Sequence, residues 1–143
     1  MTTIDRPAAT PTTTPTISRK ARIAGRIVSG VIAAALTVDA VTHIAAIEPV
    51  RQASADLGIP AHLTPVIGIV MVVCLALYLI RSTAVLGAVL LTGYFGGAVL
   101  LNMINEKPLF STVLSGVYAG AIVWIGLYLR DARVRALLPR FSR

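Results

Sequence analysis

The sequence predicts an all-α membrane protein, a bundle of four transmembrane helices. Of its 143 residues, 56% are hydrophobic and only 13% are charged, and the mean hydropathy is +0.81. Soluble globular domains carry roughly 25% charged residues. Four apolar stretches, each near the ~20 residues that cross a bilayer as a helix, occupy most of the chain. We therefore expect the lipid bilayer as a partner and no soluble domain.

No familiar catalytic motif is present. No glycine-rich phosphate loop follows a strand, and there is no Cys pair and no His cluster with ligand spacing. The single cysteine, Cys74, excludes an internal disulfide or dithiol centre. A nucleophile or cofactor beside an acid–base pair is not apparent either. We expect no metal or haem site, no catalytic residues and no autonomous enzyme.

The chain divides into a tail and a membrane domain. Residues 1–18 hold seven Thr and three Pro without apolar periodicity, so we expect a disordered cytoplasmic tail. The membrane domain covers 19–143, and its first span runs from about 24 to 47. A cleaved signal peptide is the alternative, but an apolar stretch of roughly 22 residues exceeds the ~7–15 of a signal sequence.

The other spans are bounded by charged or helix-starting residues. Thr64 is the expected N-cap of the second span, with Pro65 in its first turn. Ser82 or Thr83 caps the third span, which forms an antiparallel hairpin with the second. Each span is helical because amides in hydrocarbon need partners within the segment. The three spans cover about 64–80, 83–104 and 109–129, the last ending at a basic segment.

The loop between the first two spans carries a helical pattern of its own. Val50, Ala53 and Leu57 fall on one face of a helix, and Gly58 suits its C-terminal end. We expect a short interfacial helix here, with an irregular loop as the alternative.

Basic residues are distributed unevenly between the two ends of the predicted bundle. Four spans place both termini on one side, where eleven of the 13 Lys and Arg residues lie. By the positive-inside rule both termini are cytoplasmic, and loops 48–63 and 105–110 face outward. The net charge of +7 is thus an orientation signal, and we expect no nucleic-acid partner. The basic residues on the cytoplasmic side are Arg6, Arg19, Lys20, Arg22, Arg26, Arg81, Arg130, Arg133, Arg135, Arg140 and Arg143.

Polar residues within the spans define one candidate site. Asp39 is the most informative, because a charged residue in a transmembrane helix marks a functional site by default. Counting back from the outer boundary places it roughly 12 Å deep and His43 roughly 6 Å deep, four residues apart on one helix face. Polar residues of other spans fall at similar depths. The predicted cluster is Asp39, Thr42, His43, Asn102, Ser115 and Tyr118.

Two interpretations of this cluster stay open. It can be a site for a ligand or a proton, or its side chains can be hydrogen-bonding glue between helices. Tyr78, Tyr94 and Trp124 are interpreted as core or interfacial aromatic residues, and Cys74 as a buried small hydrophobic residue.

Small residues recur at the spacing that allows close helix contact. Gly93 and Gly97 form a GxxxG pair on the third span, and Gly116 and Gly120 form another on the fourth. We expect helix packing at these positions, within the chain in preference to between chains.

Several blocks together resemble one family. They are VDAVTH with Asp39, DLGIP at 56–60, TAVLGAVLLTGYFGGAV at 83–99, PLF at 108–110 and YLRDARVRALLP at 128–139. The chain resembles the DoxX-like small bacterial membrane proteins over about 26–139. The resemblance implies a four-span bundle in the bacterial cytoplasmic membrane, as the spans predict. The family usually has a His where this chain has Asn102, which argues against a two-His metal or haem site with His43.

The resemblance also suggests a functional context. The wider DoxX group is named after a membrane subunit of a thiosulfate:quinone oxidoreductase, and some relatives are linked to redox-protective complexes. It leaves the cofactor open, with quinone as the one it suggests, and implies a membrane or peripheral redox partner. Three hypotheses follow: an accessory subunit of such a system, a small proton-coupled carrier that uses Asp39, or a structural membrane module.

Overall fold

The computed structural model describes residues 17–137, and the regular secondary structure in that range is entirely helical, as the sequence predicts. Four helical segments are long and apolar enough to cross a membrane. Most of the predicted tail, and residues 138–143, lie outside the described residues. The spanning segments are α1 (Arg19–Ile44), α3 (Thr64–Leu79) with the preceding 3-10 turn η1 (Ala61–Leu63), α4 (Ala84–Ile104), and α5 (Ser115–Arg130) with the preceding π-helical turn η2 (Leu109–Val113).

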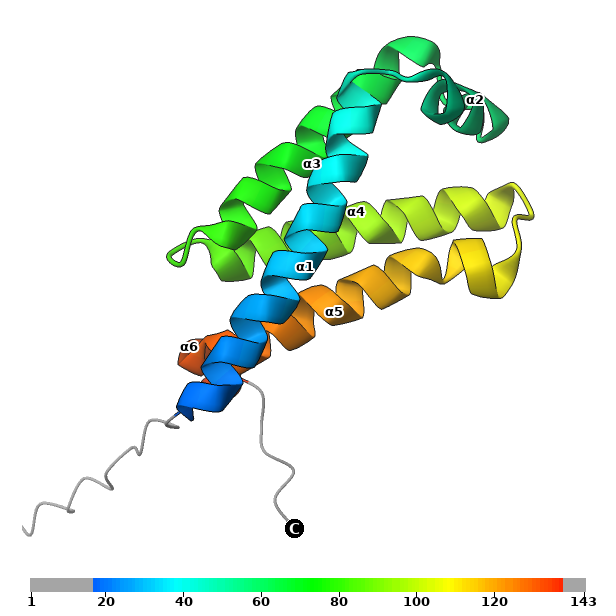
Figure 1. Ribbon diagram of the computed structural model, residues 1–143. Coiled ribbons are helices and arrows are strands. Elements are labelled where there is room, and N and C mark those ends of the chain that lie inside the picture. Colours follow the sequence, from blue (N-terminus) through cyan, green and yellow to red (C-terminus); the bar gives the residue numbers. More distant parts are fainter. Residues whose placement is uncertain (1–16, 138–143) are drawn as a thin grey trace, which may run out of the picture.

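The four spans form two pairs that diverge along the bundle. Helix α1 packs against α3 and α5, and α4 packs against the same two helices. In Figure 1, α1 and α3 separate from α4 and α5 towards the end where α2 (Glu48–Asp56) lies. The two helix pairs converge at the opposite end, near α6 (Ala132–Leu137). We call these the open end and the closed end.

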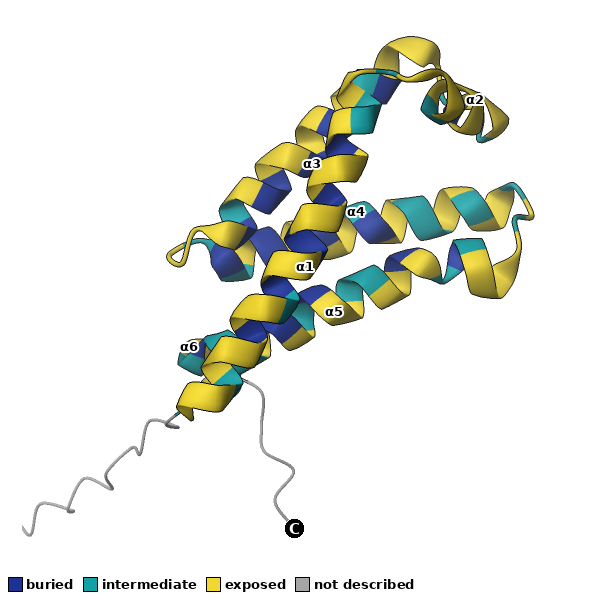
Figure 2. Ribbon diagram, viewed as in Figure 1, coloured by how far each residue is buried: buried dark blue, intermediate teal, exposed yellow. Residues whose placement is uncertain are grey.

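Burial follows this divergence. Tyr78, Leu91, Val123 and Leu127 are fully or almost fully buried where the helices converge. Beyond Phe95, no residue of α4 is buried, and Ile104 at its end is 68% exposed. Figure 2 shows the buried segments gathered where the four helices meet and exposed ones on α2 and the outer turns. The hydrophobic core therefore occupies the closed end, while the outward apolar faces are those expected to contact lipid.

The loop between α1 and α3 contains the helix α2. Ala46, at φ 47°, turns the chain after α1, and Pro49 lies in the first turn of α2. Gly58 follows the helix at φ +74°, a left-handed conformation that favours glycine. This loop is thus helical, and its position at a membrane interface stays a prediction.

The predicted N-cap residue is wrong for α3, and for α4 it is right in position but makes no side-chain cap bond. The 3-10 turn η1 leads directly into α3, so Thr64 is already helical at φ −55° and ψ −49° and cannot cap the helix. Its hydroxyl is buried and has no hydrogen-bond partner among the described residues. Thr83 is the N-cap residue of α4, but its hydroxyl donates backwards to the Leu77 carbonyl at 2.9 Å. Ser18, by contrast, caps α1 by accepting from the Ala21 amide at 3.2 Å.

Close helix contact occurs at one residue of the two predicted glycine pairs. A Cβ on Gly116 would lie 3.1 Å from the Phe95 carbonyl oxygen of α4, whereas a Cβ on Gly120 would make only an ordinary contact with the Phe95 ring, at 3.7 Å. Around Gly93 and Gly97, no atom lies within 4 Å of where a Cβ would be. The expected close contact of that pair within the chain is therefore wrong, because it faces open space; contact with a second chain stays a prediction. The tightest approaches are at Gly25, Gly68, Gly87 and Gly126.

Candidate functional site

A cavity of about 670 Å³ lies at the open end, between α1, α3 and the α4–α5 pair. This volume falls within the roughly 300–1,000 Å³ of small-molecule sites. Apolar side chains form most of its wall, including Phe95, Val99 and Leu101 of α4 and Ile67 of α3. Helix α2 and its exit complete the wall with Val50, Ala53 and Leu57. The cavity lies where the two helix pairs diverge, and α2, which packs against α1 and α3, forms one part of its wall.

Asp39 and His43 bring polar groups to this cavity from α1. Their side chains are 50% and 19% exposed, and His43 Nδ1 lies 3.6 Å from a carboxylate oxygen of Asp39. The same nitrogen lies 2.9 Å from the Asp39 carbonyl oxygen. A carbonyl only accepts, so this bond requires a proton on Nδ1 and leaves Nε2 as an acceptor in the neutral ring. The pair thus offers a carboxylate and an imidazole nitrogen to a ligand.

The remaining predicted residues divide into two groups. Asn102 and Ser115 line the cavity together with Asp39 and His43, as the depth estimate suggests. Thr42 does not line it, and its hydroxyl donates to the Asp39 carbonyl at 2.8 Å. Tyr118 does not line it either and is 51% exposed on α5. Helical phase separates the last two from the cavity, since depth alone does not decide which way a side chain faces.

Several cavity residues were not predicted. Tyr94 lies in the wall, although the sequence suggests only a core or interfacial aromatic residue. The apolar face of α2 is visible in the sequence as Val50, Ala53 and Leu57, yet the pattern does not reveal that this face covers a cavity. Ser54 and Thr112 add further hydroxyl groups to the wall. That α2 and α4 line the same cavity is a tertiary feature without a local signal.

The hydrogen bonds of the cluster are all local. Asn102 donates to the Ala98 carbonyl at 2.8 Å, and Ser115 donates to the Thr112 carbonyl at 2.6 Å. Together with the bonds of Thr42 and His43, these stay within one helix or its first turn. Among the described residues, therefore, this cluster provides no hydrogen-bonding glue between helices.

Hydrogen bonds between helices occur at other residues. Tyr78 of α3 donates its hydroxyl to the Val123 carbonyl at 3.0 Å and pairs with the Ser29 hydroxyl at 2.9 Å. This joins three helices within the core of the closed end. Trp124 of α5 donates to the Thr92 hydroxyl of α4 at 2.9 Å. The hydrogen bonds between helices, which stabilise membrane bundles, are thus made away from the cavity.

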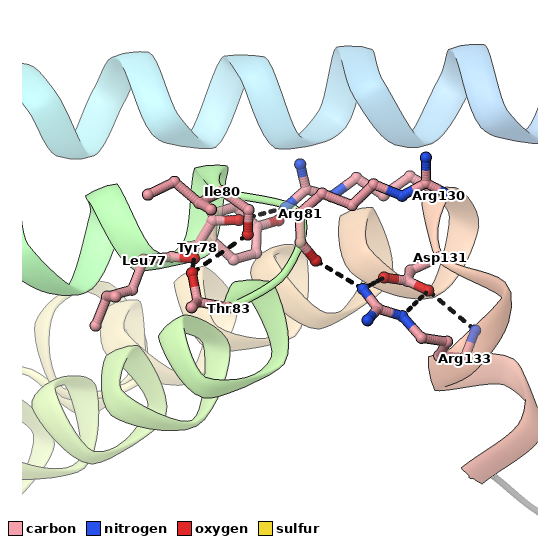
Figure 3. Close-up of polar contacts among 8 residues, drawn as sticks. All are labelled: Leu77, Tyr78, Ile80, Arg81, Thr83, Arg130, Asp131 and Arg133. Carbon is pink, nitrogen blue, oxygen red and sulfur yellow. Dashed lines mark hydrogen bonds and ion pairs between the residues drawn. The ribbon is translucent and has the colours of Figure 1, made fainter.

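Charged groups reinforce the closed end (Figure 3). Arg130 donates to the Tyr78 carbonyl at 2.7 Å, and its guanidinium carbon lies 4.5 Å from the centre of the Tyr78 ring. Asp131 accepts from Arg133, whose side chain also donates to the Arg81 carbonyl at 2.6 Å. These hydrogen bonds from Arg133 hold the pKa of the Asp131 carboxyl below its ordinary value. The turn between α3 and α4 is therefore tied to the end of α5.

In the part of the chain that the structure describes, no group of three or more His, Cys, Asp and Glu residues is placed to hold a metal ion. The polar groups at the cavity suit hydrogen bonding to an organic ligand. Asp39 and His43 Nε2 accept, the hydroxyl of Tyr94 can donate or accept, and Asn102 retains its amide oxygen and a second amide proton.

Comparison with known proteins gives one match. The family model described as the DoxX-like family matches residues 27–126. This range contains four of the cavity-lining polar residues discussed above, Asp39, His43, Asn102 and Ser115. Neither a curated protein nor a solved structure matches the chain.

Proposed function

The chain belongs to the DoxX-like family of membrane proteins, and from this premise we propose that it is a non-autonomous accessory subunit in the bacterial cytoplasmic membrane. Its role is to hold a lipophilic ligand of the quinone class for a quinone-linked or redox-protective system. The observation that carries this proposal is the cavity, which is mostly apolar but has Asp39, His43 and Asn102 in its wall.

The chemistry of the wall matches an amphipathic ring. Apolar side chains of α2, α3 and α4 suit a hydrophobic ring or tail, which they contact by van der Waals packing in place of lipid tails. A quinol hydroxyl can donate to the Asp39 carboxylate or to His43 Nε2. A quinone carbonyl can accept from Asn102 or Tyr94. Both redox forms of the ligand therefore find partners in one site.

The same wall argues for binding without catalysis. An acid–base pair is present, but the hydroxyls of Ser54, Thr112 and Ser115 in the wall make no hydrogen bond to either of its side chains among the described residues. Electron transfer to or from a bound quinone then needs a partner protein, which is why we place this chain as an accessory subunit.

Purification of the native complex tests the proposal. The protein is isolated from its own membranes in a mild detergent, and bound molecules are identified by mass spectrometry and absorption spectroscopy. We expect to find a bound quinone, or an oxidoreductase that co-purifies with the chain. A preparation free of both would contradict the proposal.

A second function is favoured by one observation, the half-exposed carboxylate of Asp39 on the cavity. A group of this kind can carry a proton, as in a small proton-coupled carrier. That function requires pH-dependent flux in proteoliposomes that Asp39→Asn abolishes while Glu48→Gln, outside the cavity, leaves it intact. The buried closed end, with Tyr78 and Leu91 fully enclosed, favours binding over passage.

A further inference from the structure

A second cavity, of about 600 Å³, lies at the closed end and is lined by four arginines. Arg22 and Arg26 come from the first turns of α1, Arg81 from the turn between α3 and α4, and Arg130 from the end of α5. Apolar contacts come from Ala84 and Leu127. Residues far apart in the sequence thus place their positive charges around one hollow.

The four positive charges around this cavity are only partly balanced in the described part of the chain, where Asp131 also interacts electrostatically with Arg81. Asp131 is the one acidic residue in its wall, and its carboxylate is held by Arg133, with the closest ion-pair distance 3.0 Å. No ion pair within 4.0 Å joins Arg22, Arg26, Arg81 or Arg130 to a carboxylate among these residues. Four like charges around one hollow favour an anion, because each guanidinium otherwise repels the others.

The cavity is also held in shape. Arg130 is fixed by its hydrogen bond to Tyr78 and by its position over the Tyr78 ring. The carbonyl of Arg81 is held by Arg133. Arg130 is therefore anchored to the buried Tyr78, and the turn that carries Arg81 is anchored to Arg133. The side chains of Arg22 and Arg26 are exposed and remain accessible.

We propose that this arginine cavity binds the phosphate group of an anionic ligand, through guanidinium pairs of the kind that recognise phosphate oxygens. The arginines lie at the ends of membrane spans, the level of lipid headgroups, and basic pockets between transmembrane helices suit anionic phospholipids. A free phosphate anion has the same recognition chemistry. This site is independent of the cavity at the open end.

Native mass spectrometry of the full chain tests the site. The detergent-purified protein is titrated with phosphatidylglycerol, with phosphatidylcholine, and with inorganic phosphate. The variant Arg26→Gln/Arg81→Gln removes two side-chain charges and keeps the Arg81 carbonyl contact. Arg19→Gln/Lys20→Gln removes two charges from the same end of α1 without touching the cavity wall. Circular dichroism verifies that each variant is folded.

We expect the wild type to prefer phosphatidylglycerol to phosphatidylcholine, and the cavity variant to bind it roughly 30-fold more weakly, which corresponds to about 1 kcal/mol for each arginine. If inorganic phosphate does not displace bound phosphatidylglycerol, the ligand of the site is a lipid. If inorganic phosphate binds directly and displaces the lipid, the ligand is a free anion. Equal weakening in both variants, or no binding of either probe, would overturn the proposal.

Discussion

The two ends of the bundle use their polar residues in opposite ways. At the closed end, Tyr78 and Ser29 are buried and bonded to each other across helices, at 2.9 Å. At the open end, Asp39, His43 and Asn102 bond only within their own helices and line a cavity. Both sets are polar residues inside membrane spans, and their sequence context is similar.

The difference shows how a small bundle can combine rigidity with a binding site. Interhelical hydrogen bonds and glycine contacts hold the helices together where they converge, so the helices can diverge at the other end without losing a common core. The polar side chains of the cavity can meet a ligand because, among the described residues, none of their hydrogen bonds joins two helices. This division predicts that substitutions at the two ends have different consequences.

The largest effect is expected for Gly87→Ala at the closed end. A Cβ at this position would overlap the backbone nitrogen of Tyr78, and backbone cannot move aside as a flexible side chain can. We expect a loss of about 3 kcal/mol in the free energy of unfolding. Gly93→Ala on the same helix is the control, with open space around the new Cβ and a gain of up to about 1 kcal/mol. Reversible unfolding in mixed micelles measures both, and equal stability of the two variants would break the comparison.

A smaller loss is expected for Tyr78→Phe. The change removes the hydroxyl that donates to the Val123 carbonyl and leaves the buried Ser29 hydroxyl without its hydrogen-bond partner. The expected cost is about 2 kcal/mol, the scale for an unsatisfied buried group. Tyr118→Phe, at an exposed position with no hydrogen bond within the described residues, should stay within about 0.5 kcal/mol of wild type. If Tyr78→Phe leaves the free energy of unfolding unchanged, the hydrogen bonds between helices do not stabilise the closed end.

A pH-dependent effect, the smallest of the three, is expected at Asp131. Its pKa in the folded protein is lowered by hydrogen bonds from Arg133, so the folded state favours the ionised carboxylate. The resulting stability is present above the ordinary pKa of an Asp and is lost as the pH falls through the lowered value. Thermal unfolding measured between pH 7 and pH 3 should therefore show a loss of stability that is smaller in Asp131→Asn than in the wild type. Parallel curves for the two proteins would contradict this role.

The local features of the sequence predicted much of the fold. Hydropathy located four spans, and the pattern around Val50, Ala53 and Gly58 located α2, because both signals are carried by neighbours along the chain. The cap at Thr64 was wrong because η1 continues the helix backwards. The Gly93 and Gly97 contact was wrong because spacing shows that a close approach is possible, not that a partner helix is there.

The site was predicted in part for the same reason. Depth along a helix can be counted, so the sequence places Asp39, His43, Asn102 and Ser115 at neighbouring depths, and all four line the cavity. The direction in which a side chain faces relative to neighbouring helices cannot be counted from the sequence. For this reason the predicted cluster contains Thr42 and Tyr118, which do not line the cavity. The Tyr78 network depends on contacts between residues more than 40 positions apart and has no sequence signal.

The most direct test compares two bulky substitutions one turn apart on α4. Gly97 lines the open-end cavity and Gly93 does not, and both have open space around the Cβ position. Wild type, Gly97→Phe and Gly93→Phe are purified from the same membranes, and quinone bound per mole of protein is extracted and quantified. We predict that wild type and Gly93→Phe retain quinone, whereas folded Gly97→Phe loses most of it. Equal quinone in all three proteins, or none in the wild type, would contradict the assignment of this cavity.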